Sequence, residues 1–185
     1  MLNYKGFTFI EMIIAISIAS LLILIVTLTY QVSDSTYRQV DRSAELSQNG
    51  RVFLDRFARE LRQTPDIITA LPTTSTSTPT ASEIVFEDGH DMSRIQYIRY
   101  YLEENTIKRQ LITYAFADAP QTTVYSYSLD AMSNPPAATI EDEKVISEHV
   151  GDLMFWGDTL VNVEIILTSN NYTIPLTTTV YARNI

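Results

Sequence analysis

The sequence predicts an α+β protein in which one long N-terminal helix packs on an antiparallel β-sheet. Two observations carry this prediction. No proline occurs before Pro65, so nothing interrupts a helix over the first third of the chain. From Glu83 onward the chain changes to short runs rich in Ile, Val, Tyr and Thr, which favour strands. A helical part followed by a strand-rich part is typical of the α+β class.

Residues 7–30 form an apolar stretch with a single formal charge, Glu11. Because a helix rises about 1.5 Å per residue, this stretch spans roughly 36 Å, enough to cross a hydrocarbon core of about 30 Å. A carboxylate near the start of a membrane helix costs at least a few kcal/mol unless a positive charge neutralises it. Lys5 lies almost two turns away, whereas cleavage of the Gly6–Phe7 bond would create an ammonium group within about one turn of Glu11.

The segment KGFTFIE with the apolar stretch that follows resembles the class III signal of type IV prepilins and type II secretion pseudopilins. The resemblance implies a pilin-like fold. It implies that a prepilin peptidase removes residues 1–6 on the cytoplasmic side and methylates the new N-terminus, Phe7. It also implies that Glu11 guides docking of the subunit into a filament. A secretory signal peptide or an ordinary anchor has a basic start and an apolar run as well, but neither has a use for Gly6–Phe7 beside Glu11.

Residues 31–64 predict an amphipathic continuation of the same helix. Charged residues recur at helical neighbour spacings, as in Arg56 and Glu60. An apolar stripe predicts the face that packs on the domain, and it comprises Leu46, Phe53, Leu54, Phe57, Ala58 and Leu61. The helix should end before Pro65, and Gly50 is its expected soft point because glycine costs about 1 kcal/mol relative to alanine.

Residues 65–82 are rich in Thr, Ser and Pro and predict a surface loop or linker, whereas residues 83–185 predict a β-rich domain. The expected strands are 83–87, a hairpin over 94–116 that turns at 104–106, a strand at 122–129, and further strands within 144–158, 160–169 and 172–184. A turn is expected at Asn170-Asn171. Residues 130–143 predict a loop, because they contain Pro135-Pro136 and an acidic cluster.

Two further segments are similar to J-type minor pseudopilins and PilW-type minor pilins. They are GRVFLDRFARELRQ at the end of the predicted helix and the closing VYARN. Any amphipathic helix rich in Arg, Leu and Phe would look much the same, so both readings stay open for the helix.

The composition restricts the function. The chain has no cysteine, which excludes a disulfide scaffold, a thiol nucleophile and a Cys-based zinc site. The formal net charge is -9, and a domain this acidic has no electrostatic footprint for direct nucleic-acid binding. Lys5 in the leader predicts a cytoplasmic N-terminus and an extracytoplasmic domain.

We expect no catalytic site and no cofactor. His90 and His149 are the only histidines, and neither lies in a motif that would make it a base or a ligand. Glu87, Asp88 and Asp91 concentrate carboxylates that could bind Ca²⁺, although their spacing is not that of an EF-hand loop, and a solvated turn is the simpler interpretation.

The sequence therefore predicts a minor pilin or minor pseudopilin, a structural subunit of a type IV pilus or type II secretion filament that acts in assembly initiation or at the tip. Its expected partners are the prepilin peptidase, other pilins or pseudopilins, the inner-membrane assembly platform and the membrane itself. The alternative is a single-pass anchored binding or sensory domain that never enters a filament. An anchored hydrolase would need a catalytic cluster that the sequence does not offer.

Overall fold

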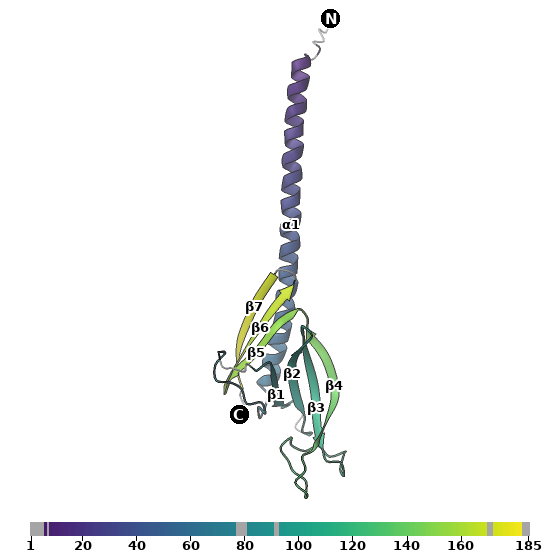
Figure 1. Cartoon of the computed structure of the whole chain (residues 1–185), viewed down its shortest axis with the longest axis vertical. Helices are drawn as coiled ribbons and strands as arrows, with labels where there is room; N and C mark the ends of the chain where they lie inside the picture. Colours follow the sequence, from purple (N-terminus) through teal and green to yellow (C-terminus); the bar gives the residue numbers. More distant parts are fainter. Residues whose placement is uncertain (1–5, 7, 77–80, 91–92, 170–171, 183–185) are drawn as a thin grey trace. The chain divides into compact units, whose positions relative to one another are not determined.

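The computed structural model of the chain describes residues 6, 8–76, 81–90, 93–169 and 172–182 (Figure 1). The chain divides into two compact units, Met1–Arg42 and Ser43–Ile185. Helix α1, Phe9–Leu61, begins in the first unit and ends in the second. The strands are β1 (Glu83–Glu87), β2 (Tyr97–Glu103), β3 (Thr106–Ala115), β4 (Ala137–Ser147), β5 (Val150–Gly157), β6 (Leu160–Ser169) and β7 (Tyr172–Tyr181). The predicted α+β class, a long helix packed on antiparallel strands, is confirmed.

The apolar stripe of α1 forms the centre of the second unit. All six residues predicted to face the domain are buried. Phe57 is fully buried, and its ring centroid lies 5.6 Å from that of Tyr100 and 5.4 Å from that of Phe155. Tyr100 belongs to β2 and Phe155 to β5, so a single helix residue contacts both halves of the β structure.

Gly50 is buried where α1 crosses the strands β6 and β7. A Cβ atom placed on it would lie 2.5 Å from Cδ1 of Leu176 and 2.6 Å from Cδ1 of Leu167. The expected soft point of the helix is therefore also a point of close approach, and the missing side chain leaves room for the leucines.

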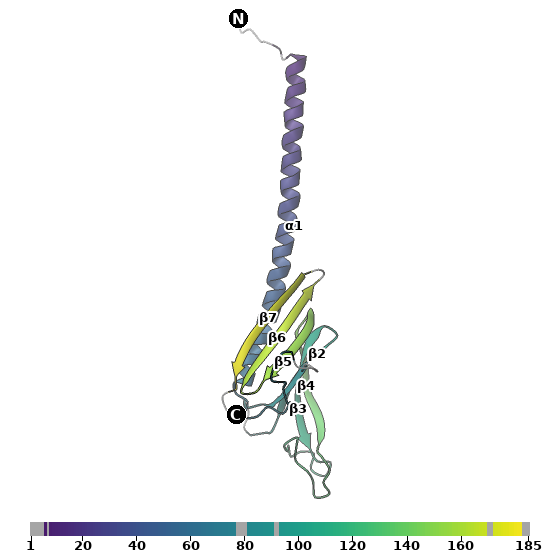
Figure 2. The ribbon, with the colours of Figure 1, turned by 60° about the vertical axis from the view of Figure 1, so that its left-hand side comes forward.

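The strands form two sheets, where the sequence predicted one. One sheet has the order β1-β2-β3-β4 and the other β5-β6-β7, and every pairing is antiparallel (Figure 1 and Figure 2). The predicted linker lies against an edge of each sheet. Ile68 N donates to Val85 O of β1, while Phe155 N and Gly157 N of β5 donate to Ala81 O and Pro72 O. The described part of residues 65–82 thus covers two strand edges.

Two strand predictions were wrong. Residues 122–129 form no strand beyond one isolated bridge at Thr123, although Tyr and Val favour strands. Half of the predicted loop 130–143 belongs to β4, because the loop ends after Pro136 and the acidic residues find partners on β3. The expected turn at Asn170-Asn171 and the closing residues 183–185 lie outside the described residues.

The hairpin of β2 and β3 agrees with its prediction. Glu104 and Asn105 occupy its turn with φ values of 47° and 63°. Two successive residues in the left-handed region give the turn whose twist matches that of the flanking strands.

The outermost strands β4 and β7 resist pairing with another chain. The register of β4 on β3 shifts twice, between Ile107 and Lys108 and between Leu111 and Ile112. Strand β7 carries Pro175, which has no backbone N–H to donate. Such bulges and prolines are common protection for sheet edges.

Candidate functional site in the N-terminal segment

Helix α1 begins with a capping box formed by Thr8 and Glu11. The backbone N–H and the hydroxyl of Thr8 each donate to Oε2 of Glu11 over 2.8 Å. In return, the backbone N–H of Glu11 lies 3.4 Å from the Thr8 hydroxyl, which accepts it. The T-x-x-E spacing before an apolar run is a sequence signature of this cap. The carboxylate of Glu11 is therefore hydrogen-bonded within its own chain.

Gly6 is exposed, and a Cβ atom built on it would meet no heavy atom within 4 Å. The described part of the chain thus gives no packing reason for glycine at this position. A requirement for glycine would have to come from a molecule that acts on this bond. Lys5 and Phe7, the flanking residues of the predicted site, lie outside the described residues.

The apolar stretch that follows exposes its large side chains. Leu22 is 56% exposed and Ile23 67% exposed, as expected for a surface that meets lipid or other helices. An 18-residue window of α1 reaches a mean hydropathy of 2.8, so this helix is long and apolar enough to cross a membrane. The hydroxyls here bond to the carbonyl four residues earlier, and they are those of Ser17, Ser20, Thr27 and Thr29. The polar side chains thus add no unsatisfied group to the apolar surface.

The most buried charged cluster of the second unit joins α1 to the four-stranded sheet. Oε2 of Glu60 accepts hydrogen bonds from Tyr100 Oη over 2.7 Å and from Arg109 Nε over 3.0 Å. Arg56, one turn earlier on the helix, donates to Oε1 over 3.1 Å, as the charge spacing predicted. Every member of the cluster has a partner, so it fixes the helix on the sheet.

The pKa values of this cluster follow from burial and pairing. Burial raises the pKa of Tyr100 well above its usual value of 10.0, and the charge of Glu60 raises it further. Burial by itself would lower the pKa of Arg109, but the hydrogen bond and charge of Glu60 outweigh it and the pKa is raised. Tyr100 therefore stays neutral and Arg109 charged, which suits a structural ion pair and provides no acid or base for catalysis near neutral pH.

A polar row crosses the four-stranded sheet on the face away from the core. Arg99 of β2 donates to Glu83 over 2.5 Å and to Gln110 over 3.3 Å, and Gln110 donates to Glu143 over 2.5 Å. Because Glu83 lies on β1, Gln110 on β3 and Glu143 on β4, these contacts link the side chains of all four neighbouring strands. The acidic run of β4 is thus built into a network of partners, which argues against a free cluster of ligands.

Of the candidate calcium residues, Glu87 and Asp88 are described, and Glu87 is the last residue of β1. Gly89 brings the backbone so close to the segment after α1 that a Cβ atom there would lie 1.8 Å from Gln63 O. Asp88 accepts the N–H of His90 over 3.0 Å, while burial and the charge of Asp66 raise the pKa of Glu87. Within the ranges that the structure describes, no three Asp, Glu or His residues lie close enough to hold a metal ion. Asp91 lies outside those ranges.

Both histidines are exposed and lie outside the strands. His90 follows β1, and its Nδ1 lies 3.4 Å from Oε1 of Gln63. His149 has a φ of 62° in the turn from β4 to β5, and its carbonyl accepts the N–H of Thr168 over 2.7 Å. Neither histidine has a nucleophile among these partners.

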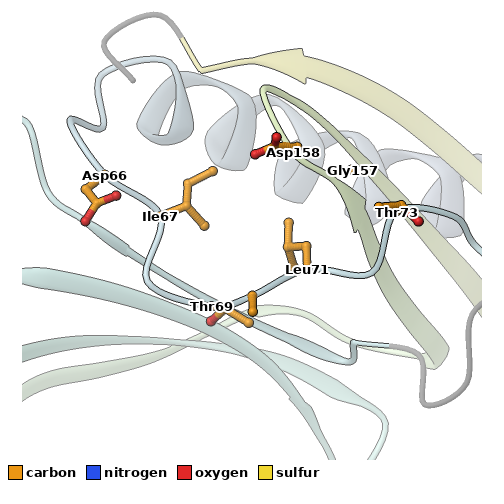
Figure 3. Close-up of a pocket in the computed structure, with 8 residues that line it drawn as sticks. Asp66, Ile67, Thr69, Leu71, Thr73, Gly157 and Asp158 are labelled. Atoms are coloured by element: carbon orange, nitrogen blue, oxygen red, sulfur yellow. The ribbon is translucent and has the colours of Figure 1, made fainter.

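A cavity of about 330 Å³ lies between the segment after α1 and the turn from β5 to β6 (Figure 3). Ile67 and Leu71 point toward its interior, while Asp66 and Asp158 lie on different sides of it. Among the described residues that line it, there is no histidine, lysine or arginine. Asp66 and Asp158 do not point at a common position in the cavity, and the side chains of Ile67 and Leu71 are apolar. The cavity therefore has no recognisable catalytic arrangement.

The fold and the N-terminal segment define a membrane-anchored α+β protein whose domain lies outside the membrane. Residues 1–27 match the family described as Prokaryotic N-terminal methylation motif. This match supports the type IV prepilin-like class III signal that the sequence predicted, and the motif implies processing by a prepilin peptidase and pilin-type assembly. Proteins with this motif are typically structural. No curated protein and no solved structure matches the chain.

Proposed function

We propose that the chain is a minor pilin or a minor pseudopilin, a structural subunit of a type IV pilus or type II secretion filament. One observation carries the proposal: residues 1–27 match the methylation motif, and the chain continues from there as one unbroken helix. The similarity of the helix end and of VYARN to J-type and PilW-type proteins supports the minor role.

The proposed processing site is the Gly6–Phe7 bond. The prepilin peptidase removes residues 1–6 and methylates the nitrogen of Phe7. The exposure of Gly6, and the open space around it, support this assignment because a peptidase needs an accessible bond. In this arrangement the leader and its Lys5 are cytoplasmic and the domain is extracytoplasmic.

In the proposed assembly step, Glu11 pairs with the N-terminal ammonium of Phe7 in its own or a neighbouring subunit. The apolar surface of α1 exchanges lipid for other helices of the filament core, which its exposed side chains make possible. Other pilins or pseudopilins and the inner-membrane assembly platform are the partners, and the subunit acts in initiation or at the tip. The role is structural, without catalysis or a resident cofactor.

The processing step is tested by producing the full chain with and without a prepilin peptidase and measuring the mass of its N-terminal peptide. We expect loss of residues 1–6 and a gain of one methyl group on Phe7. Gly6→Ala should leave the leader in place, whereas Lys5→Arg, which keeps the charge, should be processed normally. An intact leader on the unsubstituted chain in the presence of the peptidase would refute the proposal.

Glu11→Ala separates filament assembly from simple anchoring. A filament subunit with this substitution should insert and be processed but be largely lost from sheared filaments, which immunoblotting of the sheared fraction detects. A single-pass binding or sensory domain would work equally well with either residue. Normal filament incorporation of the Glu11→Ala chain would contradict the assigned role of Glu11.

A further inference from the structure

The connection between β3 and β4 displays aromatic and aliphatic side chains to solvent. Residues 125–132 form what we call the tyrosine loop, in which Tyr127 is 67% and Met132 84% exposed. The rings of Tyr125 and Tyr127 stack with their centroids 5.2 Å apart, and Leu129 is exposed as well. Large apolar groups concentrated in one exposed segment mark an interaction surface, unlike scattered single ones.

The tyrosine loop is held in place by hydrogen bonds. The N–H of Ser126, between the two stacked tyrosines, donates over 3.1 Å to the hydroxyl of the fully buried Tyr97. Asp130 accepts the N–H groups of Met132 and Asn134, each over 2.8 Å. A loop that is ordered before binding loses less conformational entropy when it docks, so its exposed side chains are suited to recognition.

The charged residues within the connection from β3 to β4 have one sign. Residues 116–136 contain Asp118 and Asp130 and no lysine, arginine or histidine. A partner of this segment should therefore present a basic surface with some apolar area. Nucleic acid and anionic lipid are disfavoured by the same negative charge.

The chain itself carries such a surface. On the solvent side of α1 in the second unit, Arg51 and Arg59 are exposed together with one aspartate, Asp55, and Arg62 is exposed in the turn that follows the helix. The spacing of four residues from Arg51 to Asp55 and from Asp55 to Arg59 places these three on one helix face, which together with Arg62 we call the arginine face. Val52, which is 53% exposed, lies beside Arg51 and supplies apolar area.

We propose that the tyrosine loop of one copy docks on the arginine face of α1 in a neighbouring copy. Guanidinium groups are attracted to tyrosine rings, the acidic loop complements the basic face, and Met132 and Val52 can be buried together. The two surfaces differ, so the contact is heterologous and needs no two-fold axis between the two copies. The inference rests on the proposed filament function and names the surfaces that meet within it.

Because the chain contains no cysteine, engineered cysteines give an unambiguous test. Two full-length copies with different tags are produced in the same cells, one with Met132→Cys and the other with Val52→Cys. A short bismaleimide is then applied to intact membranes. We expect a product that carries both tags. Val145→Cys, 50% exposed on β4, replaces Met132→Cys as the matched control and should give little product.

Charge reversal on the helix should weaken the contact. Arg51→Glu combined with Arg59→Glu should lower the yield of the doubly tagged product roughly fivefold, as expected for losing cation–π and ionic contacts. Lys144→Glu, an exposed change on β4, should leave the yield unchanged. A cooperative thermal unfolding transition at an unchanged midpoint shows for each variant that the domain is folded.

A yield no higher than that of the Val145→Cys control would overturn the inference, as would a Met132→Cys product formed only with other proteins. The N-terminal mass of the same samples keeps the two proposals apart. Removal of the leader without a doubly tagged product refutes the contact alone, whereas retention of the leader refutes the proposed function.

Discussion

The first and last parts of helix α1 differ in where their apolar side chains lie. In residues 9–30 large side chains are exposed, and Leu22 is a typical case at 56%. In residues 46–61 the apolar stripe is buried, and Phe57 is 0% exposed. The backbone is helical in both parts, so helix propensity does not distinguish them. What differs is the partner: strands in one part, and lipid or other helices in the other.

The polar side chains of the two parts differ in the same way. In the first part, hydroxyls such as that of Ser17 bond to the helix's own carbonyls. In the second part, Glu60 bonds to Tyr100 and Arg109 on the sheet. The first part therefore carries its hydrogen bonds with it into any apolar environment, whereas the second part depends on the domain.

The largest effect should come from Phe57. We expect Phe57→Ala to lower the free energy of unfolding of the domain by about 4 kcal/mol, because it leaves a cavity against both sheets. Leu22→Ala, in the exposed part of the same helix, should change it by less than about 0.5 kcal/mol. Denaturant unfolding in detergent, followed by fluorescence of the single tryptophan Trp156, measures both. Equal losses would break the distinction between the two parts.

The next largest effect concerns the buried ion pair. Glu60→Gln should destabilise the domain by about 3 kcal/mol, since Arg109 keeps its charge in a buried position without its partner. The matched control is Asp34→Asn, which removes the exposed pair of Asp34 with Arg38 (3.0 Å) and should cost less than about 1 kcal/mol. The same unfolding measurement decides. A loss below that of the control would show that the cluster contributes no net stability.

Gly50 tests how tightly the second part of the helix packs. Gly50→Val should cost about 2 kcal/mol, because the added methyl groups overlap Leu167 and Leu176. Ala44→Val, at an exposed position of the same helix, should cost less than about 0.7 kcal/mol. Leu176→Ala should be less costly in the Gly50→Val chain than in the original one. Independent effects in this double-mutant cycle would contradict the close approach.

The smallest effect is a pH dependence. The pKa of Tyr100 is raised on folding, so its contribution to stability is full below about pH 10, where the unfolded tyrosine keeps its proton, and is lost as pH rises through the folded pKa. Tyr100→Phe should cost about 1.5 kcal/mol at neutral pH and should make the alkaline decline in unfolding free energy shallower. Tyr181→Phe, 54% exposed, should leave both quantities unchanged. An unaltered alkaline slope in Tyr100→Phe would contradict the assignment.

Several features could be predicted from the sequence because they depend on local spacing. The apolar stripe of α1 follows the helical repeat, and the β2–β3 turn uses Glu104 and Asn105 in left-handed conformations. The class III signal was also predictable, since its residues are adjacent. The capping box of Thr8 and Glu11 could also be predicted from the sequence, because the T-x-x-E spacing directly precedes the apolar run.

Other features depend on contacts between distant segments. The tyrosine loop has the composition of a strand, but the hydroxyl of Tyr97 and the carboxylate of Asp130 hold it as a loop. The acidic residues of β4 favour a loop by composition, but partners on β3 stabilise them in a strand, as Gln110 does for Glu143. The division into two sheets likewise depends on how segments far apart in the chain pair, which no local pattern contains.

The bulged β4 and the proline of β7 determine what kind of contact the domain can make. Backbone pairing between strands tolerates almost any side chain, so an open edge would join many sequences without discrimination. With both outer strands protected, recognition at these edges falls to side chains. A single substitution can then change the choice of partner while the fold stays the same, which allows related subunits in one cell to diverge into separate assemblies.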